Sequence, residues 1–172
     1  MASSTTIEQS EMLPAPPEWE LELNRRLPVF GHRNWIVVAD AAYPAQSNPG
    51  IETIAAEMDH VRVLRTVLER IAAGGRLRAS IYTDLELDLV EERDAPGIAA
   101  YRRQLHGLLN GASFKQLPHE QIIARLDRCA QMFRVLVIKT DLTLPYTSVF
   151  LELDCGYWNA EAEGRLRKAM QA

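Results

Sequence analysis

Short runs of apolar residues recur along the chain and predict buried strands. Three of them, residues 35–39, 134–138 and 149–153, are almost wholly apolar and are bounded by polar or turn-forming residues. Runs of this length and composition are typical of strands that are covered on both faces. Residues 77–90 instead alternate apolar and acidic positions, which predicts a half-exposed strand.

The segments between these strands show the periodicity of helices. Apolar residues spaced three and four positions apart predict helices over 51–73 and 118–133, and the first of these runs could also hold a short strand before its helix. Shorter helices are predicted over 19–27, 99–109 and 160–170. Strands that alternate with helices indicate an α/β fold, with a mostly parallel central sheet flanked by helices.

The chain of 172 residues is long enough for one domain but not for two. Residues 1–18 are first polar and then proline-rich, with Pro14, Pro16 and Pro17 close together, so we expect a flexible N-terminal extension there. The single domain is expected to span 19–172.

Composition narrows the class of protein. A net charge of −4 argues against a phosphate-driven nucleic-acid binder. No apolar stretch approaches the roughly 20 residues that span a bilayer, and the first residues lack the apolar core of a secretory signal. Two cysteines are too few for a disulfide framework or a zinc site. We therefore expect a cytoplasmic protein that contacts neither membrane nor nucleic acid.

Two candidate functional residues flank the first buried strand. His32 precedes it and Asp40 follows it, and histidine is the natural proton carrier near neutral pH. Eight residues of extended chain span about 26 Å, so the two side chains cannot meet across one straight strand. They share a site only if the chain bends near His32 or if the pocket joins two subunits. The simpler alternative is a loop histidine and an aspartate that makes a turn.

Three further candidates lie near predicted element ends. His119 begins a helix, where the backbone N–H groups favour the neutral imidazole; the simpler alternative is a surface histidine in the first turn. Tyr146 and Ser148 stand before the last strand, where their hydroxyls could bind a polyol or simply cap a turn. His60 and His106 lie inside amphipathic helices, and we interpret both as solvated or partly packed.

Several stronger motifs are missing from the sequence. It contains no glycine-rich phosphate loop, no nucleophile elbow, and no HExxH or CxxC pair. The acidic positions Asp84, Glu86 and Asp88 alternate in a way that suggests a loose metal cluster, but more charged residues follow at once. We interpret this run as a solvated face.

One stretch is more specific than these patterns. GHRNWIVVADAAYP, residues 31–44, resembles the opening signature of the D-ribose pyranase and L-fucose mutarotase family (RbsD/FucU-like). PYTSVFLEL, residues 145–153, is similar to the closing strand of that family, and His119-Glu120-Gln121 is similar to a His-Glu-Gln step between them. The three motifs occur in the family's order and cover about half of the chain.

The resemblance implies roles for the candidate residues. His32 would match the family's catalytic acid/base, Asp40 a substrate-binding aspartate, His119 a second pocket histidine and Tyr146 the tyrosine of the closing motif. Ser148 stands where the family has asparagine, so it would bind substrate with a hydroxyl instead of an amide. The family forms ring-shaped homo-oligomers with pockets at subunit boundaries, which would bring together residues that one strand separates.

The resemblance implies a cofactor-independent isomerase, a mutarotase or pyranase, that interconverts the ring forms or anomers of a monosaccharide. Opening a cyclic hemiacetal needs proton transfer but no redox step, so neither a cofactor nor a metal is expected. Three alternatives stay open: a monosaccharide-binding protein of the same fold without turnover, a structural or regulatory oligomer with a degenerate site, and a metal-dependent sugar isomerase.

Overall fold

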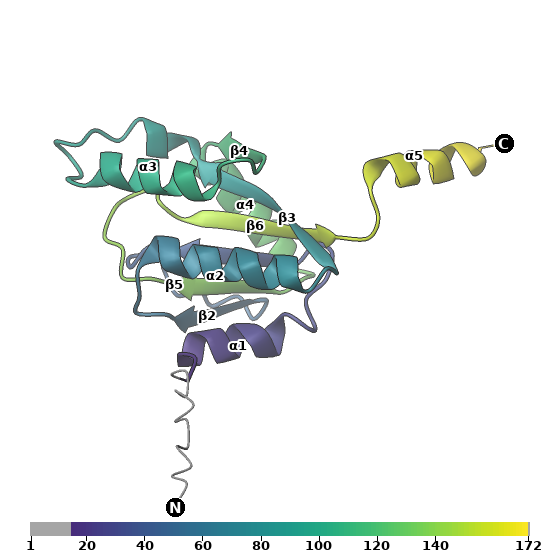
Figure 1. The fold of residues 1–172 in the computed structure, drawn as a ribbon, viewed down its shortest axis with the longest axis horizontal. Coiled ribbons are helices and arrows are strands. Elements are labelled where there is room, and N and C mark those ends of the chain that lie inside the picture. Colours follow the sequence, from purple (N-terminus) through teal and green to yellow (C-terminus); the bar gives the residue numbers. More distant parts are fainter. Residues whose placement is uncertain (1–14, 172) are drawn as a thin grey trace, which may run out of the picture.

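The structure is a computed structural model that describes residues 15–171. Five α-helices, one 3₁₀ helix and six strands follow one another in these residues (Figure 1). In chain order they are α1 (Glu18–Arg26), β1 (Trp35–Ala39), β2 (Ile51–Ala55), α2 (His60–Ala73), β3 (Leu77–Asp84), η1 (Leu85–Asp88), α3 (Ile98–Leu108), β4 (Phe114–Leu117), α4 (His119–Ala130), β5 (Val135–Lys139), β6 (Val149–Cys155) and α5 (Ala160–Ala169).

The strands form one sheet in the order β2-β5-β1-β6-β3-β4. β1 pairs in parallel with β5, β5 with β2, and β3 with β4, whereas β6 is antiparallel to both of its neighbours. All strands except β6 therefore run in the same direction. This confirms the predicted α/β fold with a mostly parallel sheet.

Helices cover both faces of the sheet. Figure 1 shows α2 in front of the sheet and α4 behind it. α1, α2 and α3 bury residues such as Leu23, Leu64 and Ile98 against one face. α4 buries Ile122 and Leu126 against the other. β1 lies at the centre, where all five of its residues are buried, as its apolar sequence predicts.

Two predicted elements differ from the structure. The helix predicted over 51–73 is wrong at its start, where the alternative of a short strand is confirmed by β2. The strand predicted over 77–90 ends at Asp84, after which the acidic residues continue as the 3₁₀ turn η1. Apolar and acidic residues alternate along both parts, so the pattern does not mark the end of the strand.

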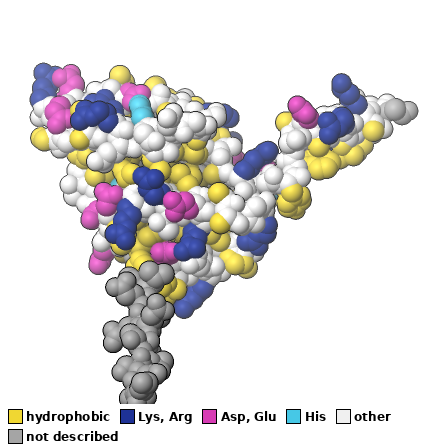
Figure 2. Space-filling view, viewed as in Figure 1, with side chains coloured by type: hydrophobic (Ala, Val, Ile, Leu, Met, Phe, Trp, Pro, Cys, Tyr) yellow, Lys and Arg dark blue, Asp and Glu magenta, His cyan; other side chains and the backbone are white. Residues whose placement is uncertain are grey.

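Most of the predicted N-terminal extension, residues 1–14, lies outside the described residues. Residues 15–17 are exposed and lead directly into α1, which buries Trp19 and Leu23. At the other end, α5 buries no residue and extends away from the sheet (Figures 1 and 2). Within 15–171, no helix is both long and apolar enough to cross a membrane.

Gly50 is the last residue of the loop between β1 and β2, and it packs against the end of α4. A Cβ at Gly50 would overlap the carbonyl oxygen of Ala130 and lie 2.9 Å from its carbonyl carbon, at the end of α4. We expect Gly50→Ala to lower the free energy of unfolding by about 2–3 kcal/mol, measured by urea denaturation. Gly31→Ala, where a Cβ meets open space, is the control and should change it by less than about 0.5 kcal/mol.

Candidate functional site

Because every strand but β6 runs the same way, the carboxyl ends of five strands meet at one edge of the sheet. Open α/β sheets bind ligands at this edge. We use the term carboxyl edge for this edge and the residues that lie at it, which include Asp40, Asp84, His119, Tyr146 and Ser148. Asp40 follows β1, Asp84 ends β3, His119 begins α4 after β4, and the other two precede β6.

Asp40 and Ser148 are joined directly, although 108 positions separate them in the sequence. The Ser148 hydroxyl donates a hydrogen bond of 3.1 Å to Asp40 Oδ2. The backbone N–H of Ala42 donates to Asp40 Oδ1 at 2.9 Å, which fixes the turn after β1. Asp40 also lines a cavity of about 380 Å³ with Pro145, within the size range of small-molecule sites.

His119 is held from three sides at the same edge. Its backbone N–H donates to both carboxylate oxygens of Glu86, at 3.1 and 3.0 Å. Its Nδ1 lies 3.1 Å from Asp84 Oδ1. The Tyr146 ring meets the imidazole edge to face, with centroids 5.7 Å apart. Tyr146 adopts φ of 57°, a left-handed conformation that non-glycine residues rarely adopt outside constrained sites.

Burial changes the acid–base properties of this edge. Asp84 is fully buried, and desolvation raises the pKa of its carboxyl to about 6 despite the opposing effect of His119. Desolvation also raises the pKa of Tyr43 to about 12, with added repulsion from Asp127 and Asp84. The Tyr43 hydroxyl therefore stays protonated at neutral pH and can donate a hydrogen bond.

Unpartnered polar atoms gather at the carboxyl edge. Among residues 15–171, both carboxylate oxygens of Asp84, the Tyr43 hydroxyl, the Thr83 hydroxyl and His119 Nδ1 are buried without a hydrogen-bond partner. His119 Nδ1 is within ion-pair distance of Asp84 but is not aligned with it for a hydrogen bond. Buried polar groups usually find partners, so such a concentration is typical of a functional site.

A buried polar chain supports the loop that carries Tyr146 and Ser148. The Tyr101 hydroxyl donates to the Thr147 carbonyl at 2.9 Å and lies 3.2 Å from His60 Nδ1. His60 Nε2 lies 3.1 Å from the Val38 carbonyl oxygen. Burial lowers the pKa of His60 to about 4, so its ring is neutral. Our interpretation of His60 as solvated or partly packed is therefore wrong, because it is 1% exposed.

His32 lies at the opposite edge of the sheet, and the structure does not bring it to the other candidates. It precedes β1, and its Nδ1 is 2.8 Å from Oδ1 of Asp154 near the end of β6. Arg78 Nε donates to the other oxygen of Asp154 at 3.1 Å. The straight strand β1 separates His32 from Asp40, as the 26 Å estimate predicts. No bend of the chain joins them within one copy.

Asp84 and Tyr43 are the residues that sequence reasoning missed. The interpretation of Asp84, Glu86 and Asp88 as one solvated face is wrong for Asp84, which is fully buried and lies against His119 of α4. The only signal in the sequence is the change from a largely apolar run to an acidic residue at the end of β3. Tyr43 belongs to the opening motif, but the residues around it have the composition of a loop.

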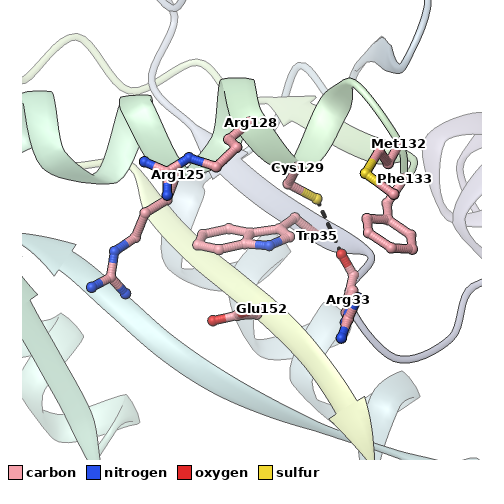
Figure 3. Close-up of a pocket in the computed structure, with 8 residues that line it drawn as sticks. All are labelled: Arg33, Trp35, Arg125, Arg128, Cys129, Met132, Phe133 and Glu152. Atoms are coloured by element: carbon pink, nitrogen blue, oxygen red, sulfur yellow. Dashed lines mark hydrogen bonds between the residues drawn. The ribbon is translucent and has the colours of Figure 1, made fainter.

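A second cavity lies between α4 and the sheet (Figure 3). It measures about 480 Å³, and its lining includes Arg33, Trp35, Arg125, Arg128 and Glu152. The Arg33 guanidinium lies over the Phe133 ring and that of Arg125 over the Tyr82 ring, each 5.6 Å from the centroid, so these groups do not converge on one point. It contains none of the predicted site residues.

The carboxyl edge can bind a neutral ligand that is rich in hydroxyl groups. The partly exposed Asp40 carboxylate can accept hydrogen bonds from such a ligand, and the partly exposed His119 can transfer a proton. Among residues 15–171, no group of three or more His, Cys, Asp or Glu side chains could hold a metal ion.

An α/β sheet with a polar carboxyl edge defines a class of small-molecule-binding proteins. The model of the RbsD / FucU transport protein family matches residues 19–155. The chain therefore belongs to this family, as its motifs predicted. No curated protein matches the chain.

Solved structures share the fold. RbsD of Bacillus subtilis complexed with D-ribose is 17% identical, with a TM-score of 0.55, and the match covers 89% of this chain and 98% of that one. The fucose mutarotase of Streptococcus pneumoniae in complex with L-fucose is 22% identical, with a TM-score of 0.51, covering 77% and 91%. FucU of Bifidobacterium longum is 15% identical, with a TM-score of 0.51, covering 78% and 94%.

Proposed function

We propose that this protein is a monosaccharide mutarotase or pyranase, which opens and recloses the sugar ring by acid–base catalysis. The observation that carries the proposal is the arrangement of side chains at the carboxyl edge. Asp40 and Ser148 are hydrogen-bonded to each other there, and His119 lies against the buried carboxylate of Asp84. Its chemistry suits a neutral polyol, and the family includes structures with ribose and fucose bound.

The reaction needs two proton transfers. A base removes the proton from the anomeric hydroxyl while an acid protonates the ring oxygen, and the bond between the anomeric carbon and the ring oxygen breaks. The resulting aldehyde recloses on its other face or through another hydroxyl. No group is oxidised or reduced. General acid–base catalysis of about 10²–10⁴-fold would suffice.

We assign Asp40 and Ser148 to holding sugar hydroxyls and Tyr146 to orienting the ring. His119 binds the sugar through its exposed side, while Asp84 fixes the orientation of its imidazole. His32 is the proton carrier, and a second copy of the chain supplies it. The placement of His32 at the far edge, where its side chain is 60% exposed, supports this composite site.

Exchange NMR on ribose, fucose, galactose and glucose tests the function. We expect the protein to accelerate exchange between ring forms of at least one of these sugars. His106→Ala is the control and should retain the activity, because this exposed residue of α3 lies beside Phe114 and is not among the residues assigned to the site. Saturable sugar binding without acceleration would instead establish the binding-protein alternative, and no binding at all would contradict both.

A further inference from the structure

Gly156, the residue that follows β6, is held against the start of β3. The N–H of Gly156 donates to the Arg76 carbonyl at 2.8 Å. A Cβ at Gly156 would lie 2.9 Å from the Gly75 carbonyl oxygen and 3.0 Å from the Arg76 carbonyl carbon. Only glycine fits such a close approach to the start of β3. The residues that follow are therefore anchored beside the edge that carries His32.

These residues form one wall of a cavity of about 630 Å³. The sheet side of the cavity includes His32, Arg78 and Asp154, and the other side includes Tyr157, Trp158 and Glu163. Figure 2 shows the concave junction where α5 leaves the body. The family model matches residues 19–155, so the second wall lies outside the matched residues.

The sheet side of this cavity is polar and preorganised. Asp154 accepts from the Cys155 N–H at 2.8 Å and from Arg78, and the Arg78 hydrogen bond lowers the pKa of Asp154. An ionised Asp154 holds the proton of His32 on Nδ1, because that nitrogen lies 2.8 Å from its oxygen. His32 Nε2 is then the atom that is free to exchange a proton.

The opposite wall carries an oriented aromatic ring. The indole N–H of Trp158 donates to Glu163 Oε2 at 2.8 Å, which fixes the ring relative to α5. Trp158 is 44% exposed, whereas Trp19 and Trp35 are 4% and 3% exposed. An aromatic face opposite polar side chains suits a sugar, which has an apolar C–H face and hydroxyls around its rim.

We propose that Trp158 is a stacking platform for the monosaccharide on which His32 acts, so that the segment after β6 is a specificity-determining wall of the site. This inference rests on the proposed function, because it places the same sugar between Trp158 and His32 Nε2. The ligand class is a neutral monosaccharide with an exposed C–H face.

Kinetics on the full chain separate stacking from chemistry. We expect Trp158→Ala to raise KM about tenfold with kcat within about twofold of wild type, and Trp158→Phe to restore most of the affinity. Leu166→Ala is the matched control, because this residue is exposed on α5 but does not line the cavity. An unchanged KM in Trp158→Ala would overturn the proposal while leaving the proposed function intact.

Fluorescence gives a readout that does not depend on turnover. Acrylamide should quench Trp158 selectively, since the other two tryptophans are buried, and a bound sugar should protect it. Saturable protection without accelerated exchange would support the platform and contradict the proposed function. Accelerated exchange without protection would support the proposed function and overturn the platform. If the protein showed neither protection nor accelerated exchange, both proposals would be overturned.

Discussion

His32→Ala protein is expected to lose at least about a hundredfold in kcat for ring exchange, because the carboxylates that share its cavity, Asp154 and Glu163, are paired with Arg78 and Arg167, and hydrogen bonds to their oxygens lower their pKa values. The side chain is exposed, and its removal leaves Asp154 bound to Arg78 and to a backbone N–H, so the fold should persist. Exchange NMR on the confirmed sugar measures the loss, and circular dichroism checks the fold. Activity close to that of wild type would show that His32 is not the proton carrier.

Mixing inactive variants tests whether two copies complete one site. Co-expressed His32→Ala and Asp40→Asn chains that assemble at random should regain about a quarter of wild-type activity, because that share of sites would take both intact residues. If His32 and Asp40 served separate sites within each chain, the mixture would be no more active than its parents. The parental variants, each expressed alone, are the controls.

The sequence predicted the central part of the fold because burial leaves a direct signature. β1, β5 and β6 are apolar runs that helices cover on both sides, and loops or surface helices rarely have such a composition. The edge strand β4 was missed, because its four residues FKQL are short and half polar. An edge strand depends on its neighbour for hydrogen bonds and so leaves a weaker pattern.

The candidate site was predictable where a residue lies next to a buried strand. Asp40 follows β1 and Ser148 precedes β6, and the structure joins them. Asp84 was not predictable, because its burial depends on α4, which begins 35 positions later. The separation of His32 from Asp40 followed from strand geometry alone, but which surface of another copy would bring them together is not encoded in any local pattern.

We expect ionisation of Asp84 to lower the free energy of unfolding, although the same side chain supports activity. Its pKa of about 6 lies above the ordinary value of 3.8, so between these pH values the folded chain keeps a proton that the unfolded chain loses. The free energy of unfolding therefore falls as pH rises through this range, by up to about 3 kcal/mol in total. Asn cannot ionise, so Asp84→Asn should lack this decrease.

We therefore expect Asp84→Asn to match wild type at pH 4 and to exceed its stability at pH 8, in urea denaturation at both pH values. Its exchange activity should fall at least about tenfold, because the negative charge of the Asp84 carboxylate, 3.1 Å from His119 Nδ1, stabilises a proton on that nitrogen and an uncharged amide does not. Asp88→Asn, an exposed position on η1, is the control for both measurements. A variant with the pH dependence and activity of wild type would rule out an ionised Asp84 as the partner of His119. A gain in stability with a loss of activity would instead identify Asp84 as a buried charge that is retained for its effect on His119.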